Sequence, residues 1–215
     1  MSLKTETLIV TPFEVNCYLC WDPESGDGVI IDPGGNESEI LRKVGRLAFT
    51  PKGILLTHGH ADHIGAVEPL RTKLGIPLYA GINESSLLSS PQENMSAFFD
   101  TPLSIRKPEF LLNDEEVVLV GSLRFLVLAT PGHTPGGVCY LDETNGNLFC
   151  GDTLFQGSVG RTDLPGGDTQ TLLESIRAKI LALPDSVVCY PGHGPRTTVG
   201  AERHHNPFLT GAYFA

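Results

Sequence analysis

The chain is poor in charged residues, and in lysine and arginine above all. Of its 215 residues 19% are charged, and 25 acidic residues against 15 basic ones give a formal net charge of −10. So few charges exclude disorder driven by charge repulsion. Binding to nucleic acid or to an anionic membrane needs clustered lysine and arginine, so we expect neither a nucleic-acid partner nor a membrane partner.

Long apolar runs are lacking as well. The longest one, residues 117–129, is interrupted by Ser122 and Arg124 and is shorter than the about 20 residues that a membrane-spanning helix needs. The N-terminal residues do not show the basic segment and apolar core of a signal peptide. The five cysteines are odd in number and lie mostly in apolar runs, which is typical of reduced thiols in a cytoplasmic protein.

What the chain does have is enough apolar residues for a sizeable core, 40% of the total, and many turns, with 24 glycines and 16 prolines. No flexible linker divides it, so we expect a single domain over residues 1–215. The predicted strands are 5–11, 16–21, 28–31, 53–56, 78–80, 116–120, 123–129, 137–141, 148–150 and 187–190. The predicted helices start after the caps Asn36 and Asp168 and also cover 64–74 and 199–205. This order predicts an α+β fold, in which two sheets pack face to face with helices outside.

Four of the predicted strands end in a short turn that contains histidine or aspartate. The residues in these turns are His58, His60, Asp62 and His63 after the first strand, His133 after the second, Asp152 after the third and His193 after the fourth. Five of the seven histidines lie there, and loops at rigid strand ends can aim their side chains at one point. Imidazole and carboxylate together suit zinc, iron or manganese without any thiolate.

The spacing within these turns predicts a metal centre. His58 and His60, two residues apart, can bind one ion, and Asp62 and His63 are offset to face a second ion. Asp152 can bridge two cations with its two oxygens. Taken singly, His133 and His193 could instead be buried histidines that bond to a carbonyl, but each follows a Pro-Gly pair that lets the backbone approach closely.

The run Thr57–His63, followed by Pro-Gly-His133, Gly-Asp152 and Pro-Gly-His193, resembles the metallo-β-lactamase superfamily. The resemblance implies a four-layer αββα sandwich with the site at one edge of the two sheets. It also implies a role for each residue, with His58, His60 and His133 on a first metal, Asp62, His63 and His193 on a second, and Asp152 as the bridge. Asp32 matches an acidic residue that supports the ligands from behind, although an aspartate before proline also simply forms turns.

The segments 151–155, 160–163 and 165–168, with the ending 206–209, are similar to short glyoxalase II-like hydrolases. This similarity implies two divalent metal ions, Zn²⁺ first, with iron or manganese also accepted. It implies a small anionic thioester substrate such as S-lactoylglutathione, cleaved by hydroxide from a metal-bound water, which Asp62 orients or deprotonates. Only 22 residues (215 − 193) follow His193, too few for the helical domain that binds glutathione in longer relatives, so its glutathione contacts are not carried over.

Several alternatives stay open at the level of the sequence. Arg161 can receive a substrate carboxylate or can pair with Asp163 to brace its loop. A mononuclear iron persulfide dioxygenase would need only His58, His133 and Asp152, and a non-catalytic metal-binding scaffold is a third function class. The oligomeric state is left undetermined.

Two further motifs are expected to have no chemical role. Cys17 and Cys20 have the spacing of redox and metal motifs, but residues three apart on a strand point to opposite faces, so we expect both to pack in the core. His204 and His205 lie in a predicted exposed helix and are expected to face solvent.

Overall fold

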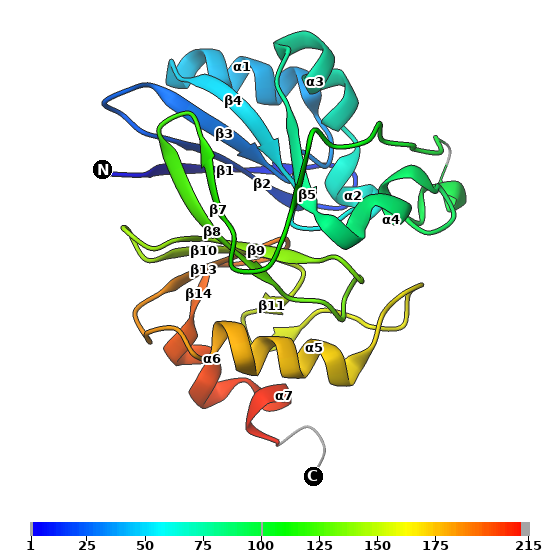
Figure 1. The fold of residues 1–215 in the computed structure, drawn as a ribbon, viewed down its shortest axis with the longest axis vertical. Helices are drawn as coiled ribbons and strands as arrows, with labels where there is room; N and C mark the ends of the chain where they lie inside the picture. Colours follow the sequence, from blue (N-terminus) through cyan, green and yellow to red (C-terminus); the bar gives the residue numbers. More distant parts are fainter. Residues whose placement is uncertain (1, 100, 212–215) are drawn as a thin grey trace.

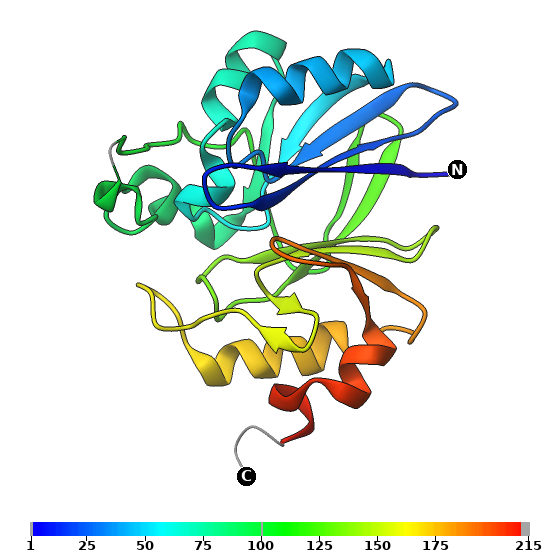
Figure 2. The same cartoon turned by 180° about the vertical axis from the view of Figure 1, so that it is seen from behind.

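Two six-stranded sheets lie face to face, with helices on the outer side of each (Figures 1 and 2). The computed structural model describes residues 2–99 and 101–211. The first half of the chain builds one sheet and the second half builds the other. The α+β class and the four-layer αββα sandwich expected from the sequence are therefore confirmed.

The first sheet is mixed. Its strands in spatial order are β1 (Lys4–Val10), β2 (Val15–Trp21), β3 (Asp27–Ile31), β4 (Thr50–Leu55), β5 (Leu78–Gly81) and β6 (Phe110–Leu112). β1 to β3 are antiparallel neighbours, and β3 to β6 run parallel. Parallel neighbours need crossover connections, which here contain α1 (Glu37–Leu47), α2 (Ala61–Ile64), α3 (Val67–Leu74) and α4 (Ser85–Ser89). Of these, α1 and α3 cover the outer face of the sheet (Figure 1).

The second sheet is antiparallel except at one pair of strands. Its spatial order is β14 (Thr197–Thr198), β13 (Val188–Pro191), β10 (Asn147–Gly151), β9 (Val138–Asp142), β8 (Leu123–Ala129) and β7 (Val117–Val120). The parallel pair, β10 and β13, is joined by a ribbon of β11 (Leu154–Phe155) and β12 (Ser158–Val159) and by α5 (Thr169–Ser175), which continues to residue 180. α5, α6 (Val199–His205) and α7 (Pro207–Thr210) lie on the outer side of this sheet (Figure 1).

Three apolar cores separate the four layers, because alternate residues of a strand face opposite sides of its sheet. On β2, Cys17 packs toward the helices while Cys20 packs between the sheets, as expected, so the two thiols do not form a site. On β10, Phe149 faces the other sheet and Cys150 faces α5. All five cysteines are buried and free.

One predicted helix is interrupted. The expected helix over residues 64–74 is two helices, α2 and α3, separated at Gly65 and Ala66. A Cβ atom on Gly65 would lie 2.2 Å from the carbonyl oxygen of Gly34, and the Ala66 N–H donates to the carbonyl of Pro33. The chain after β3 therefore packs directly against this break, and tertiary contact overrides local periodicity.

The predicted helix caps had different outcomes. The Asp168 carboxylate accepts a hydrogen bond from the Thr171 N–H, so its capping role is confirmed. Asn36 stands at the start of α1 but does not cap it, because its side-chain oxygen accepts from the N–H and the hydroxyl of Thr11 instead. The strands β6, β11, β12 and β14 and the helix α7 were not predicted from the sequence, and all of them are four residues or shorter.

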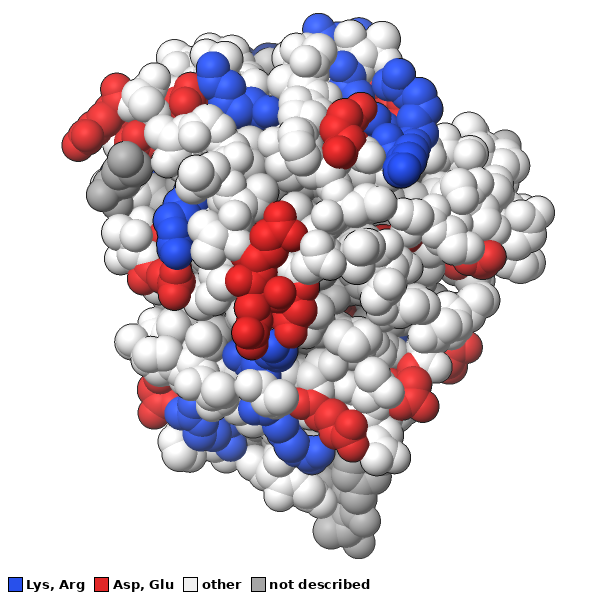
Figure 3. Space-filling model, in the orientation of Figure 1, with Lys and Arg blue, Asp and Glu red and all other residues white. Residues whose placement is uncertain are grey.

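Charged side chains are mostly paired across the surface. Lys179 lies 2.6 Å from Asp114 and 2.9 Å from Glu115, and Arg124 pairs with Glu143. On the face shown in Figure 3, basic side chains lie beside acidic ones and do not form one basic patch. Within residues 2–99 and 101–211, no helix is long and apolar enough to cross a lipid bilayer.

Candidate metal centre

The four strands that were expected to present ligands end at the same edge of the sandwich. β4 leads to His58, His60 and α2, and β8, β10 and β13 lead to the loops that follow them. α2 lies at that edge, between the two sheets (Figure 1). The structure thus brings all seven predicted residues together from four loops that are far apart in sequence, in two clusters: His58, His60 and His133, and Asp62, His63, Asp152 and His193.

The first cluster consists of three buried imidazoles. Nε2 of His133 lies 3.0 Å from Nδ1 of His60 and 3.2 Å from Nε2 of His58. Two nitrogens bound tetrahedrally to one zinc ion at about 2.0–2.1 Å are about 3.3 Å apart, so this spacing fits a common ion. The Nδ1–H of His133 donates to the carbonyl of Arg161 at 2.7 Å, which leaves its Nε2 free to bind a metal.

The second cluster combines two imidazoles with two carboxylates. His193 Nε2 lies 3.1 Å from Asp62 Oδ2, and His63 Nε2 lies 3.4 Å from Asp152 Oδ1. The other oxygen of Asp152, Oδ2, lies 3.8 Å from His133 Nε2 in the first cluster. The same Oδ2 lies 3.7 Å from His193 Nε2, so Asp152 belongs to the second cluster and its Oδ2 also faces the first.

The residues present fit a metal ion. Two of their buried polar atoms that lie 3.4 Å apart, His63 Nε2 and Asp152 Oδ1, have no hydrogen-bond partner. Leaving a buried polar atom without a partner costs about 1–3 kcal/mol, and more for a charged group, so two at one place indicate a missing partner. Imidazole nitrogens and carboxylate oxygens are ligands that zinc, iron and manganese accept.

The two clusters differ in their electrostatics. Burial and the neighbouring His133 lower the pKa of His60 to about 3, and burial also lowers the pKa of His58. At His63 burial opposes protonation, but three carboxylates, above all that of Asp62, raise its pKa well above the usual value. Protonation is therefore disfavoured at His58 and His60 and favoured at His63.

The sequence profile of the metallo-beta-lactamase superfamily matches residues 10–193, which contain both clusters. The chain belongs to the metallo-beta-lactamase superfamily. Together with its His/Asp clusters, membership of this superfamily of metallo-hydrolases implies bound divalent metal ions.

Individual members of the superfamily align over nearly the whole chain. Hydroxyacylglutathione hydrolase GloC of Haemophilus influenzae is 40% identical over 210 residues, covering 96% of this chain and 98% of that protein. The crystal structure of the B3 metallo-beta-lactamase BLEG-1 superposes with a TM-score of 0.91 at 42% identity, over 96% of this chain and 100% of that one. TTHA1623 in a di-iron-bound form gives a TM-score of 0.83 at 39% identity, over 95% and 100%.

Asp32 lies directly behind the second cluster. Its Oδ2 is 3.1 Å from His63 Nδ1 and accepts a hydrogen bond from the Thr57 hydroxyl. Its Oδ1 accepts a hydrogen bond from the Thr57 N–H. The same Thr57 hydroxyl lies 3.1 Å from His58 Nδ1. Asp32 thus contacts a histidine of the second cluster, and Thr57, for which no role was predicted from the sequence, connects it to the first cluster.

Arg161 lines the cavity over the metal centre but is paired. Its guanidinium makes two hydrogen bonds of 2.7 Å to the carboxylate of Asp163, and both side chains are exposed. The cavity measures about 210 Å³. Its apolar walls, Phe13, Met95, Phe99 and Leu164, carried no recognisable motif in the sequence.

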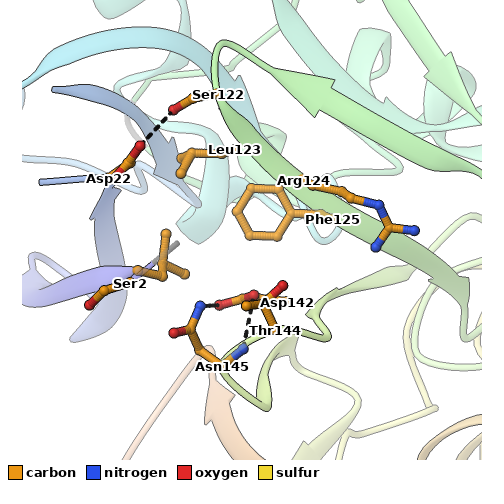
Figure 4. Close-up of a pocket in the computed structure, with 10 residues that line it drawn as sticks. Ser2, Asp22, Ser122, Leu123, Arg124, Phe125, Asp142, Thr144 and Asn145 are labelled. Carbon is orange, nitrogen blue, oxygen red and sulfur yellow. Dashed lines mark hydrogen bonds between the residues drawn. The ribbon is translucent and has the colours of Figure 1, made fainter. Parts of the chain in front are cut away.

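Other candidate residues lie away from the metal centre. The Cys150 thiol donates to the carbonyl of Leu154 in the outer core, and His204 and His205 are exposed, as expected. At the opposite edge of the sheets, before β3, β8 and β10, a small cavity of about 50 Å³ lies beside Asp22 and Asp142 (Figure 4). Hydrogen bonds from neighbouring side chains, such as those of Ser122 and Asn145, already satisfy these carboxylates.

Proposed function

We propose that this chain is a binuclear metal-dependent hydrolase of thioesters such as S-lactoylglutathione. The observation that carries the proposal is the position of Asp152, which belongs to the second ligand cluster and also faces the first. The 40% identity to a protein named hydroxyacylglutathione hydrolase supports the substrate class, and the di-iron form of TTHA1623 supports a two-metal site. The proposal includes a cytoplasmic location and no nucleic-acid partner.

In this proposal His58, His60 and His133 would hold one ion and Asp62, His63 and His193 the other, with Asp152 within reach of both. Two divalent ions at this place supply a water that is acidic enough to react near pH 7 and a Lewis acid for the substrate carbonyl. Zn²⁺ is the first candidate, and iron or manganese suits the same ligands. The net positive charge of such a site favours a small anionic substrate.

Asp62 has the position and the charge to orient the attacking water. Its pKa lies below the usual value because the nearby His63 and the hydrogen bond from His193 outweigh its burial, so it is ionised at neutral pH. It lines the cavity together with His60, His133 and Asp152. A carboxylate there accepts a hydrogen bond from a water and fixes the direction of its lone pair.

Elemental analysis and thiol release from S-lactoylglutathione, measured on one batch purified without added metal, test the proposal. We expect two metal ions per chain and hydrolysis. Asp152→Asn is expected to bind fewer than two ions and to lose at least about 100-fold in kcat, because metal catalysis contributes several kcal/mol. The matched control is Asp142→Asn, because Asp142 is a buried aspartate at the opposite edge. This variant is expected to keep the metal content and the kcat of the wild type.

A mononuclear iron persulfide dioxygenase is the second candidate. The ligand set that favours it is His58, His133 and Asp152, two histidines and a carboxylate, of which Asp152 lies 3.8 Å from His133. One iron per chain, oxygen consumption with a persulfide and no thiol release from thioesters would establish it and overturn the hydrolase. Bound metal without turnover of either substrate would favour a non-catalytic scaffold.

A further inference from the structure

The metal cavity shares part of its wall with a second, larger hollow, and none of the described residues that line this hollow is charged. This groove measures about 560 Å³ and shares Phe13, Ala61 and Phe99 with the metal cavity. The described residues that line it are Pro12, Phe13, Gly34, Ala61, Gly65, Ser96, Phe98, Phe99, Thr101 and Leu103. None of these ten is charged, in a chain with 40 charged residues.

Exposed aromatic rings form the walls of this groove. Phe98 is 72% exposed, and the rings of Phe13 and Phe99 lie 4.9 Å apart although the two residues come from different loops. Large apolar side chains gathered on a surface mark a binding site more often than chance exposure. Because Phe13, Ala61 and Phe99 line both hollows, a molecule bound at the metal centre can extend into this groove.

We propose that this groove binds an apolar acyl chain of the thioester substrate. This inference rests on the proposed function and extends it. The glutathione part of such a substrate carries two carboxylates and an ammonium group, which an uncharged aromatic groove would desolvate without compensation. The one arginine among the described residues of the metal cavity, Arg161, is already paired with Asp163. The acyl part is therefore the one that fits.

A series of S-acyl glutathiones with acetyl, butanoyl and hexanoyl groups tests the groove at constant thiol. We expect kcat/KM to rise with chain length by up to about 4-fold per buried methylene. The hexanoyl-to-acetyl ratio is expected to fall several-fold in Phe98→Ala and Phe99→Ala. Phe110→Ala, which removes an exposed ring on β6 outside the groove, should keep the ratio of the wild type.

Two results overturn this inference while leaving the hydrolase in place. One is a kcat/KM that does not depend on acyl length in the wild type. The other is an equal change of the ratio in Phe99→Ala and Phe110→Ala. Failure to hydrolyse any member of the series would instead contradict the proposed function itself.

A different observation concerns Glu84, a carboxylate without any exposed surface beneath the first cluster. Its Oε1 accepts hydrogen bonds from the Gly59 N–H at 3.2 Å and the Thr134 hydroxyl at 2.6 Å, and its Oε2 accepts from the Gly136 N–H at 3.1 Å. All of these donors are neutral. Burial raises the pKa of Glu84, and the three hydrogen bonds oppose that shift.

These three donors belong to the two loops that carry the first cluster. Gly59 lies between His58 and His60, and Thr134 directly follows His133. We propose that Glu84 is a positioning residue that fixes the three imidazoles of the first cluster relative to one another. Asp62 and His63 follow in the loop of Gly59, but none of these hydrogen bonds reaches the loops of Asp152 or His193, so we expect the influence of Glu84 to be larger at the first cluster.

Glu84→Gln tests this role with almost no change of shape. The glutamine amide oxygen can accept the hydrogen bonds of one carboxylate oxygen. The NH₂ group of the amide then takes the place of the other oxygen and faces a hydrogen-bond donor. Two-bond ¹H–¹⁵N spectra of the histidine rings during zinc titration of chelator-treated protein report each cluster separately. We expect zinc binding at His58, His60 and His133 to weaken about 10- to 100-fold. Binding at His63 and His193 should weaken much less.

Glu202→Gln is the matched control. Glu202 is also buried and also accepts three hydrogen bonds, from the Thr197 hydroxyl, the Gly157 N–H and the Asn206 amide, far from both clusters in the fold of the C-terminal segment. If Glu84→Gln does not fold, Thr134→Val removes one of the three donors and should shift the first cluster in the same direction by less. Equal zinc affinities in Glu84→Gln and wild type, or equal losses in Glu84→Gln and Glu202→Gln, would overturn the proposal.

Discussion

Single residues behind the ligands decide how well the ligands are oriented, and Asp32 is the clearest case. Its carboxylate accepts from Thr57 and lies 3.1 Å from His63 Nδ1, which fixes the ring and leaves Nε2 pointing into the second cluster. We expect Asp32→Asn to weaken metal binding at that cluster about 10- to 100-fold, since outer hydrogen-bond partners have effects of this size. Metal content after dialysis against a chelator series measures it.

The control for Asp32→Asn is Asp22→Asn. Asp22 is also almost fully buried and accepts hydrogen bonds from Glu24, Ser25 and Ser122, but it lies at the opposite edge (Figure 4). The Asp22→Asn variant should be less stable than the wild type and should keep its metal. Equal metal content in the two variants would show that Asp32 only stabilises the fold.

The protonation of single imidazoles predicts an order of metal loss with pH. Carboxylates raise the pKa of His63 despite its burial, and the hydrogen bond to Asp62 raises that of His193, so protons compete with metal at the second cluster already near neutral pH. The pKa of His60 is about 3, so protons compete little at the first cluster. Between pH 8 and pH 6, affinity at the second cluster should fall about tenfold per pH unit for each proton displaced.

Equilibrium dialysis at pH 8, 7 and 6 followed by elemental analysis checks this order. We expect the metal content to fall from two ions toward one before the first cluster loses its ion. Simultaneous loss of both ions, or earlier loss at the three-histidine cluster, would contradict it.

That these seven residues gather in two clusters could be predicted from sequence, because each lies in a short turn directly after an apolar strand. Glu84 and Asn16 could not, because their partners lie in loops that are distant in sequence and no local pattern marks such a contact. For Arg161 the sequence left a substrate contact and a pair with Asp163 open, and the structure shows the pair.

At the scale of the element, the loop after β13 is built around a glycine that touches the centre. A Cβ atom on Gly192 would lie 2.1 Å from Asp152 Oδ1 and 2.6 Å from His63 Cε1. Gly192→Ala must therefore displace Asp152 or His63, and we expect loss of at least one metal ion and a drop in activity of at least about 100-fold. Metal analysis and thiol release measure both effects.

Gly45→Ala provides the comparison, because Gly45 is exposed in α1 and a Cβ atom there would meet no other atom within 4 Å. There the substitution should raise stability by about 0.5–1 kcal/mol and leave the metal content unchanged. A Gly192→Ala protein with two ions and normal turnover would mean that the loop relaxes freely.

Elements were predictable where local signals were strong and tertiary contacts did not compete. The loop of residues 143–146 joins β9 and β10 as antiparallel neighbours, and its Gly146 has a positive φ of 67°, which glycine adopts without strain. The helix over 64–74 was wrong in its continuity near its start, because Gly34 and Pro33 pack against Gly65 and Ala66. Strands of two or three residues, such as β11 and β12, gain their pairing from neighbours and leave no periodic pattern.

At the scale of the whole molecule, each half contributes ligands to both clusters. Residues 58–63 follow a strand of the first sheet, whereas His133, Asp152 and His193 follow strands of the second. The centre therefore exists only when the sheets are correctly docked, and the apolar core between them fixes that docking. Sequence order predicted which loops meet but not the side chains that join the two halves.

Asn16 and Tyr18 on β2 join the first sheet to the loop of His193 in the second. The Asn16 amide donates to the carbonyls of Pro191 at 3.0 Å and Gly194 at 2.8 Å, and the Tyr18 hydroxyl donates to Pro191 at 2.6 Å. Asn16→Ala removes both amide hydrogen bonds, so we expect a loss of about 1–3 kcal/mol in the free energy of unfolding. Because the loop carries His193, metal affinity at the second cluster should fall as well.

Urea unfolding of the chelator-treated protein and zinc titration measure the two effects of Asn16→Ala. Tyr18→Phe is the milder comparison, because Asn16 still donates to the Pro191 carbonyl. Its free energy of unfolding should fall by only about 1 kcal/mol, with little change in zinc affinity. If Asn16→Ala unfolds at the urea concentration of the wild type, the Asn16 side chain is not needed to hold the loop of His193, which the Tyr18 hydroxyl and the main-chain N–H of residue 16 still bind. If its stability falls while its zinc affinity does not, Asn16 holds the halves together without orienting the metal ligand.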